Sequence, residues 1–232
     1  MTKAAHPRSA EPVGGAIRVS GGIDVSTLLL QPARQTALYV LAHGAGAGMR
    51  HPFMESIAQR LAGQGIGTLR YQFPYTEQGG RRPDPEPLLL ATVRAAVAAG
   101  REAAGSLPLL AGGKSMGGRM TSRAAAAAPL PGVTGIAFLG FPLHPAGRPG
   151  TARADHLAKV EVPMLFLQGT RDTLADLTLL GPVVERLGDR ATLRVIEQAD
   201  HSFHVLKRSG RTDEQVLDEL AIATAEWRES LT

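Results

Sequence analysis

Cysteine is absent from all 232 residues of the sequence. Its absence excludes disulfide bonds, thiolate nucleophiles and cysteine-ligated zinc sites. We expect no metal and no other cofactor, because the histidine pair in "HSFH", His201 and His204, lacks a third ligand at zinc-binding spacing. A chain without cysteine is compatible with the reducing cytoplasm, which is the expected location.

Aromatic residues are also scarce, at 4% of the chain, which disfavours a surface that stacks on nucleic-acid bases. The net charge of +4 comes mostly from arginines that are scattered along the sequence instead of forming a basic stripe. No apolar run reaches the ~18 to 20 residues that a membrane-spanning helix needs. The sequence therefore predicts neither a nucleic acid nor a membrane as a partner, and it leaves the oligomeric state open.

What the sequence does contain is an alternation of short apolar runs and longer amphipathic stretches. We expect residues 1–15, which are polar and rich in Pro and Gly, to form a flexible tail, and residues 16–232 to form one α/β domain with a mostly parallel sheet. Strands are expected at 16–22 and 25–32, as an antiparallel pair, and then at 37–44, 67–73, 107–113, 133–141, 160–170 and 192–199. Helices are expected at 51–65, 88–105, 174–188 and 212–231. The segment 142–161 is too short for a large cap domain.

One strand pattern runs directly into "GGKSMGG", in which Gly113 and Gly117 lie two residues to either side of Ser115. A helix pattern follows and ends before Pro129. A nucleophile in such a strand-to-helix turn has a strained backbone, and only residues without bulky side chains fit two positions away. This context favours Ser115 as a nucleophile over the alternative, an ordinary helix-capping serine in a Gly-rich turn.

A serine hydroxyl needs a base that removes its proton and an acidic residue that orients the base. In this architecture the acid follows a late strand and the base follows the last one, and Asp172 and His201 occupy those positions. Asp176 is a nearby competitor, but it falls in the first turn of a predicted helix, where a carboxylate favours the dipole. His204 is the other competitor and is expected in a short helical turn. The remaining loop and tail histidines are expected to be solvated: His6, His51, His144 and His156.

Acyl transfer also needs backbone amides that stabilise an oxyanion. The amide of Met116, next after the nucleophile, is one expected donor, because it lies at the start of a helix. The Gly-rich loop "HGAGAG" offers the second donor, from either Ala45 or Gly46. His43 in the same loop is expected either to brace it by hydrogen bonding or to be an ordinary histidine at a strand end.

Several segments carry a resemblance to a known family: "LAHGAGAGMRHPFM", "LRYQFPY", "GGKSMGGR", "FPLHP", "LFLQGTRD" and "ADHSFH", in this order. The chain resembles the α/β-hydrolases, and more narrowly the small cap-less branch related to testis-expressed protein 30 and to dienelactone hydrolases. The resemblance implies an eight-stranded, mostly parallel sheet flanked by helices, with Ser115, Asp172 and His201 in the triad positions. Dienelactone hydrolases have cysteine where this chain has Ser115, which disfavours that lactone activity.

The sequence thus predicts a serine hydrolase that cleaves a carboxylic ester, or a related acyl bond, of a small molecule through an acyl-enzyme. A thioester, an amide or a lactone is an alternative substrate. The alternative function is a catalytically silent scaffold, since relatives in the testis-expressed branch include a scaffold subunit of a chromatin-acetylating complex. Substrate-binding residues are not predicted, although Arg81 or Arg82 would favour an anionic substrate if their loop were not merely exposed and solubilising.

Overall fold

A computed structural model describes residues 11–231 of the chain. Its strands are β1 (Val13–Val19), β2 (Ile23–Leu30), β3 (Ala37–Ala42), β4 (Ile66–Tyr71), β5 (Leu109–Lys114), β6 (Val133–Leu139), β7 (Met164–Gly169) and β8 (Ala191–Ile196). They form one eight-stranded sheet in the order β1-β2-β4-β3-β5-β6-β7-β8. The pairs β1–β2 and β2–β4 are antiparallel and the remaining pairs are parallel, which confirms the predicted α/β fold.

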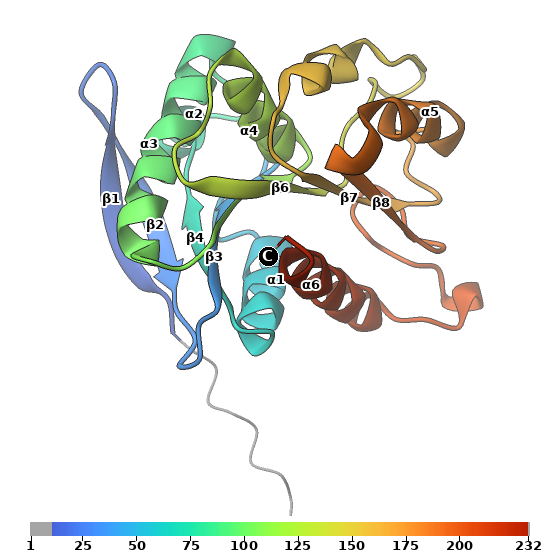
Figure 1. Ribbon diagram of the computed structural model, residues 1–232, viewed down its shortest axis with the longest axis horizontal. Coiled ribbons are helices and arrows are strands. Elements are labelled where there is room, and N and C mark those ends of the chain that lie inside the picture. Colours follow the sequence, from blue (N-terminus) through green and yellow to red (C-terminus); the bar gives the residue numbers. More distant parts are fainter. Residues whose placement is uncertain (1–10, 232) are drawn as a thin grey trace, which may run out of the picture.

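Helices cover both faces of the sheet (Figure 1). The α-helices are α1 (Pro52–Gly63), α2 (Pro74–Glu77), α3 (Glu86–Ala104), α4 (Met116–Ala127), α5 (Leu177–Leu187) and α6 (Asp213–Glu229). Short 3-10 helices lie between these elements, at η1 (Ala152–Lys159), η2 (Gly188–Arg190) and η3 (Lys207–Ser209). Helices α1 and α6 pack on one face, and α3, α4 and α5 pack on the other.

The central strands are mostly apolar because both of their faces are buried. In β3, Leu38 and Val40 join the apolar cluster under α3 and α4, whereas Tyr39 and Leu41 join the cluster under α1 and α6. Alternate side chains of a strand point to opposite faces, so one uninterrupted hydrophobic run serves both layers. Because β3, β5, β7 and β8 run parallel, their carboxyl ends lie at the same edge of the sheet, between the two apolar layers.

Several element boundaries differ from the sequence predictions. Strand β1 begins at Val13, so the last residues of the predicted tail are paired with β2, while residues 1–10 lie outside the described part. Strand β7 begins at Met164, directly after Pro163, which has no amide hydrogen for a strand ladder. Strand β8 ends at Ile196 because the chain turns at Gln198, whose φ is 61°. The Pro-rich segment 74–87, for which the sequence predicts a loop and no helix, contains α2 at its start.

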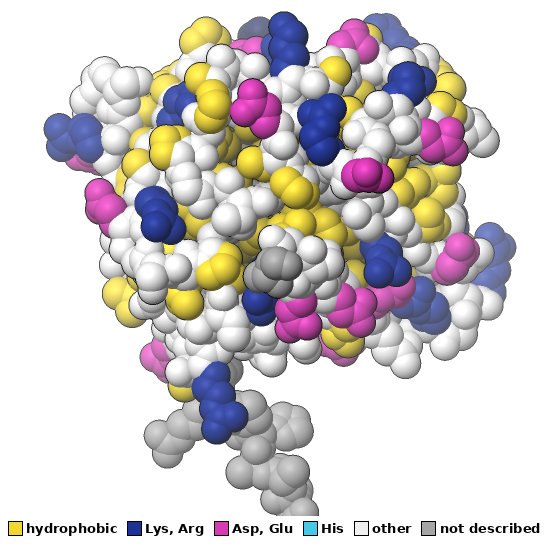
Figure 2. Space-filling model, in the orientation of Figure 1, with side chains coloured by type: hydrophobic (Ala, Val, Ile, Leu, Met, Phe, Trp, Pro, Cys, Tyr) yellow, Lys and Arg dark blue, Asp and Glu magenta, His cyan; other side chains and the backbone are white. Residues whose placement is uncertain are grey.

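The segment between β6 and β7 contains η1 as its one helix, so residues 11–231 include no large cap over the sheet. Within residues 11–231, no helix combines the length and the apolar character that crossing a bilayer requires. On the face seen in Figure 2, Lys and Arg side chains lie among Asp and Glu side chains instead of forming one patch. The carboxyl edge of the sheet is thus open to small molecules without a domain that must move first.

Candidate active site

Ser115 lies in the turn between β5 and α4 with a φ of 50°, a left-handed conformation that strains a residue with a side chain. The turn is possible only because the residues two positions before and after Ser115 are glycines. A Cβ atom on Gly113 would lie 2.2 Å from the carbonyl oxygen of Ala42, and one on Gly117 would lie 2.6 Å from that of His43. The local sequence therefore holds the Ser115 hydroxyl at the carboxyl edge of the sheet.

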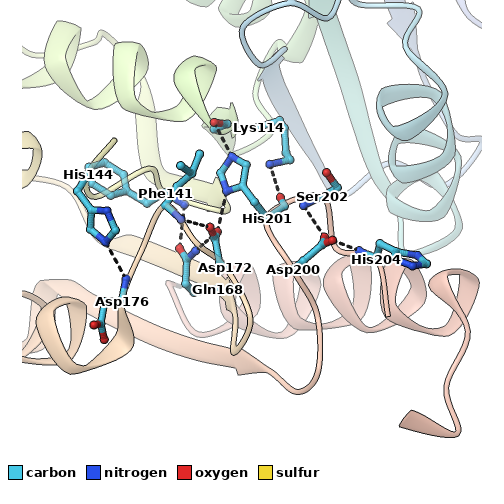
Figure 3. A network of polar contacts seen from close by, with 12 residues as sticks. Lys114, Phe141, His144, Gln168, Asp172, Asp176, Asp200, His201, Ser202 and His204 are labelled. Carbon is cyan, nitrogen blue, oxygen red and sulfur yellow. Dashed lines mark hydrogen bonds and ion pairs between the residues drawn. The ribbon is translucent and has the colours of Figure 1, made fainter. Parts of the chain in front are cut away.

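The side chains of Ser115, His201 and Asp172 form a continuous hydrogen-bonded chain. Figure 3 shows the part of it between His201 and Asp172. The Nε2 atom of His201 lies 2.8 Å from the Oγ atom of Ser115, and Nδ1 of His201 lies 2.7 Å from Oδ2 of Asp172. His201 comes from the loop after β8, and Asp172 from the loop after β7. The structure thus brings together three residues that are far apart in the sequence.

The environment of Asp172 sets the roles of the atoms in this chain. Its side chain is fully buried, its Oδ1 atom accepts a 2.7 Å hydrogen bond from the amide of Leu174, and its Oδ2 atom accepts a hydrogen bond from the Gln168 side chain. Because the Asp172 carboxylate accepts from these donors, Nδ1–H of His201 must donate to it, and Nε2 is left to accept the Ser115 hydroxyl proton. This is the tautomer that a general base needs.

Gln168 is a supporting residue that the sequence analysis missed. Its Oε1 atom accepts a 2.9 Å hydrogen bond from the amide of Phe141, which fixes the amide group that then donates to Asp172 (Figure 3). The signal in the sequence was a single polar residue inside the apolar run "MLFLQG" of β7. A fully buried glutamine in a strand needs partners for its amide, and here those partners belong to the site.

The two competing residues have other partners. Asp176 caps α5, since its carboxylate accepts a 2.8 Å hydrogen bond from the amide of Thr178, so it lies at the N-cap itself and not in the first turn. The Nδ1 atom of His204 lies 2.8 Å from the carboxylate of Asp213, and this hydrogen bond raises the pKa of the exposed imidazole. Neither side chain contacts Ser115.

His43 braces the Gly-rich loop after β3. Its Nε2 atom accepts a hydrogen bond from the amide of Phe73 at 3.2 Å, so Nδ1–H donates to the carbonyl oxygen of Gly44 at 2.8 Å. The side chain is fully buried and contacts the rings of Phe73 and Tyr75. Of the two predicted roles, the structure shows the bracing one, which connects the loop to the segment after β4.

His43 makes the stability of the protein depend on pH. Burial lowers its pKa to about 4, whereas an unfolded histidine titrates near ~6.5. Between these values the unfolded chain binds more protons, so the contribution is fully present above pH ~6.5 and is lost as the pH falls toward 4. We expect the free energy of unfolding to drop by about 2 kcal/mol between pH 7 and pH 5 because of this residue.

Urea denaturation at the two pH values measures this loss, and His43→Gln is the comparison, because glutamine forms hydrogen bonds but does not titrate. The variant should be less stable than the wild type at pH 7 but should lose about 2 kcal/mol less on acidification. An equal acid-induced loss in both proteins would show that His43 is not the titrating group.

The prediction that the loop histidines are solvated is wrong for two of them. His144 is buried, and its Nε2 atom accepts a 3.1 Å hydrogen bond from the amide of Asp176 (Figure 3). His156 is half-buried and pairs with the Ser122 hydroxyl at 2.8 Å, and burial lowers its pKa to about 4. These contacts join segments distant in sequence, so the local pattern did not reveal them. His51 caps α1, and His6 lies outside the described residues.

Ser115 lies between two cavities. One, of about 380 Å³, is mostly apolar, and its walls include Phe53, Met54 and Leu174. The other, of about 400 Å³, includes Arg119 and Arg153 together with the carboxylates of Asp84 and of Glu86, the first residue of α3. A larger cavity of about 620 Å³ lies where α4 ends, at Ala125 to Val133, but no residue of the Ser115–His201–Asp172 chain lines it.

The lining of these cavities bears on the residues proposed from sequence. Ala45 lines both of the cavities beside Ser115, and Met116 lines the second, whereas Gly46 lines neither. The amide of Gly46 instead lies near the hydroxyl group of Tyr75. Burial raises the pKa of this hydroxyl and the Gly46 amide opposes that rise, although the two groups do not form a regular hydrogen bond.

The loop that contains Arg81 and Arg82 contributes other residues to the site. Both arginines are exposed and line neither cavity beside Ser115, whereas Pro83 and Asp84 of the same loop line the second one.

Comparisons with known proteins agree with this architecture. A lidless α/β serine hydrolase from Xanthomonas campestris superimposes with a TM-score of 0.73 at 21% identity, over 97% of this chain and 98% of that one. A dienelactone hydrolase from Anabaena variabilis gives 0.73 at 22% identity, over 95% and 97% of the two chains. An esterase from Pyrococcus furiosus gives 0.72 at 15% identity, over 96% and 93%. At these identities the similarity shows the fold.

The family follows from the sequence itself. The model of the α/β-hydrolase domain family matches residues 35–229, which run from the start of β3 to the end of α6 and include Ser115, Asp172 and His201. The two amino-terminal strands lie outside the match, and they are the part of the sheet farthest from the candidate site. Since the match covers most of the chain, the protein belongs to the α/β-hydrolase domain family, in its cap-less form.

Proposed function

We propose that the protein is a serine hydrolase of the carboxylesterase type, which cleaves a small ester through an acyl-enzyme. The observation that carries the proposal is the unbroken hydrogen-bonded chain from Ser115 through His201 to Asp172, with distances of 2.8 and 2.7 Å. A scaffold protein needs no such arrangement. The fold alone is not the argument, because the α/β-hydrolase fold also supports other functions.

The proposed reaction follows from the tautomer of His201. Oγ of Ser115 attacks the ester carbonyl carbon while Nε2 of His201 takes its proton, and Asp172 stabilises the imidazolium. When the tetrahedral intermediate collapses, the C–O bond to the alcohol breaks and His201 protonates the leaving oxygen. Water, activated by the same imidazole, then hydrolyses the acyl-enzyme and restores Ser115.

The negative charge on the tetrahedral intermediate requires donors that point at one position. We assign the amide of Met116, because it opens α4 and first-turn amides have no partner within a helix. For the second donor we assign Ala45 instead of Gly46, because Ala45 lines both cavities that border Ser115. The hydrogen bonds of His43 to the Gly44 carbonyl and the Phe73 amide hold this loop in place.

The size of the apolar cavity, about 380 Å³, supports small acyl groups. We expect p-nitrophenyl acetate and butyrate to be hydrolysed with the highest kcat/KM, and the value to fall by about tenfold or more for the dodecanoate, which the open cavity cannot enclose. Initial rates across this ester series, with Ser115→Ala as the blank, provide the measurement.

A fluorophosphonate probe supplies an independent test of the proposed function, because it bonds only to an activated serine. Mass spectrometry of the labelled protein should find the adduct on Ser115. Highest activity on the dodecanoate would contradict the small acyl site, and the absence of both hydrolysis and labelling would favour the scaffold alternative.

A further inference from the structure

Lys114, the residue directly before Ser115, is a feature of the site that the proposed reaction does not use. Its side chain is partly buried and lines the apolar cavity beside Ser115. The Nζ atom donates a 2.7 Å hydrogen bond to the backbone carbonyl oxygen of His201, as Figure 3 shows. The residue beside the candidate nucleophile is thus bonded to the main chain of the candidate base, 87 residues farther along the sequence.

The surroundings of Lys114 hold its ammonium group at this position. Nζ lies 5.9 Å from the ring centroid of Phe53 and 5.6 Å from that of Phe203, within the range of cation–π attraction. The two rings stack on each other with their centroids 5.9 Å apart. Phe53 belongs to α1 and Phe203 to the loop that carries His201, so the cation joins three separate segments of the chain.

The surroundings of Lys114 disfavour the charged form of its side chain. Burial lowers the pKa of Lys114 to about 8, and the carboxylates of Asp172 and Asp200 oppose that shift. A methionine of similar length would pack among the same rings without any loss of hydration. Stability alone therefore does not explain why an amine is here.

The loop that carries His201 is a short turn built around Asp200. The carboxylate of Asp200 accepts hydrogen bonds from the amides of Ser202 at 2.8 Å and His204 at 3.0 Å. Phe203, in the same turn, has a φ of 64°, which strains a residue with a side chain. The carbonyl of His201 projects out of this turn, and Lys114 is the side chain that bonds to it.

We propose that Lys114 is a positioning residue, whose hydrogen bond to the His201 carbonyl holds the His201 imidazole against Ser115. The inference rests on the proposed function and deepens it. One peptide segment, Lys114–Ser115, contributes both the hydroxyl that His201 must reach and the amine that fixes His201 within reach. A displacement of the turn would shift the imidazole and the serine relative to each other, and an error of about 1 Å in such a contact can reduce the rate about 100-fold.

The test compares Lys114→Met, which removes the donor and the charge, with Lys114→Arg, which keeps a cationic donor. Lys159→Met is the matched control, because Lys159 is exposed and lines neither cavity beside Ser115. Steady-state kinetics on p-nitrophenyl butyrate give kcat and KM separately. We expect Lys114→Met to lower kcat by about 10- to 100-fold with KM within about threefold, Lys114→Arg to retain more of kcat, and Lys159→Met to behave as wild type.

Two further measurements separate positioning from a merely structural role. Melting temperatures establish that each variant is folded, and proton NMR follows the resonance of the Nδ1–H that His201 donates to Asp172. In folded Lys114→Met this resonance should shift or broaden, whereas in Lys159→Met it should not. A kcat within about threefold of wild type, with an unchanged resonance, would overturn the proposal.

The experiments distinguish failure of the proposed hydrolase function from failure of the positioning role of Lys114. A wild-type protein that hydrolyses no ester and takes up no fluorophosphonate is not a serine hydrolase, whatever Lys114 does. The Nδ1–H resonance still decides the positioning role in that case: a change in Lys114→Met supports it, and an unchanged resonance overturns it.

Discussion

Replacing Ser115 with alanine is expected to lower ester hydrolysis by about 10⁶-fold. The reason is that the acyl-enzyme cannot form without the Oγ atom, so only the uncatalysed attack of water, aided by the oxyanion donors, remains. The substitution removes one oxygen and keeps the Cβ atom, so the left-handed backbone at a φ of 50° is strained to the same degree in both proteins. Rates on p-nitrophenyl butyrate, with the melting temperature as a folding control, test this expectation.

The same variant should lose all covalent labelling by fluorophosphonate. Ser122 is a suitable control serine, because it also contacts a histidine, at 2.8 Å from His156, but its hydroxyl is fully buried and donates to the carbonyl oxygen of Arg119. Ser122→Ala should keep its labelling. Activity of Ser115→Ala within tenfold of the wild type would identify another residue as the nucleophile.

Replacing His201 with alanine is expected to lower hydrolysis by about 10⁵- to 10⁶-fold, nearly as much as loss of the nucleophile. Ser115 would keep its hydroxyl but lose the acceptor 2.8 Å away, and the buried carboxylate of Asp172 would lose the imidazole at 2.7 Å. Parallel kinetics on folded variants are sufficient to measure this effect. Fluorophosphonate labelling should slow by a similar factor, because it depends on the same base.

His204→Ala is the matched control, since it removes the same side chain three residues away. His204 is exposed and its partner is Asp213, so we expect activity to stay within about tenfold of the wild type. The pair of variants distinguishes a catalytic base from a histidine that happens to follow the last strand. An active His201→Ala enzyme together with an inactive His204→Ala enzyme would reverse our assignment.

Features set by local steric rules were predictable from the sequence. The apolar runs located the strands, because a buried parallel strand needs apolar residues on both faces. The glycines at 113 and 117 located the turn at Ser115, because the space for a Cβ atom at each is occupied by backbone of the neighbouring strand. Asp172 and His201 followed from the chain order of strands, since the carboxyl ends of parallel strands share an edge.

Features that depend on contacts between distant segments were not predictable. The hydrogen bonds of Gln168 to Asp172 and of Lys114 to His201 require the register of the strands, which no local pattern encodes. For the same reason the partner of His156 was missed, and the histidine was expected to be solvated. The one-turn helix α2 is not predicted because its four residues show no helical periodicity, and Pro74 suits a loop as well as the first turn of a helix.

The order of strands in the sheet has a consequence for the assembly of the molecule during synthesis. Ser115 follows β5 in the middle of the sheet, whereas His201 follows β8 at its edge. The imidazole can contact the hydroxyl only once β6, β7 and β8 have taken their places in the sheet, and amino-terminal segments leave the ribosome first. Under the proposed mechanism, a nascent chain contains Ser115 before it contains the base that activates it. We therefore expect fluorophosphonate to label folded molecules and not nascent chains.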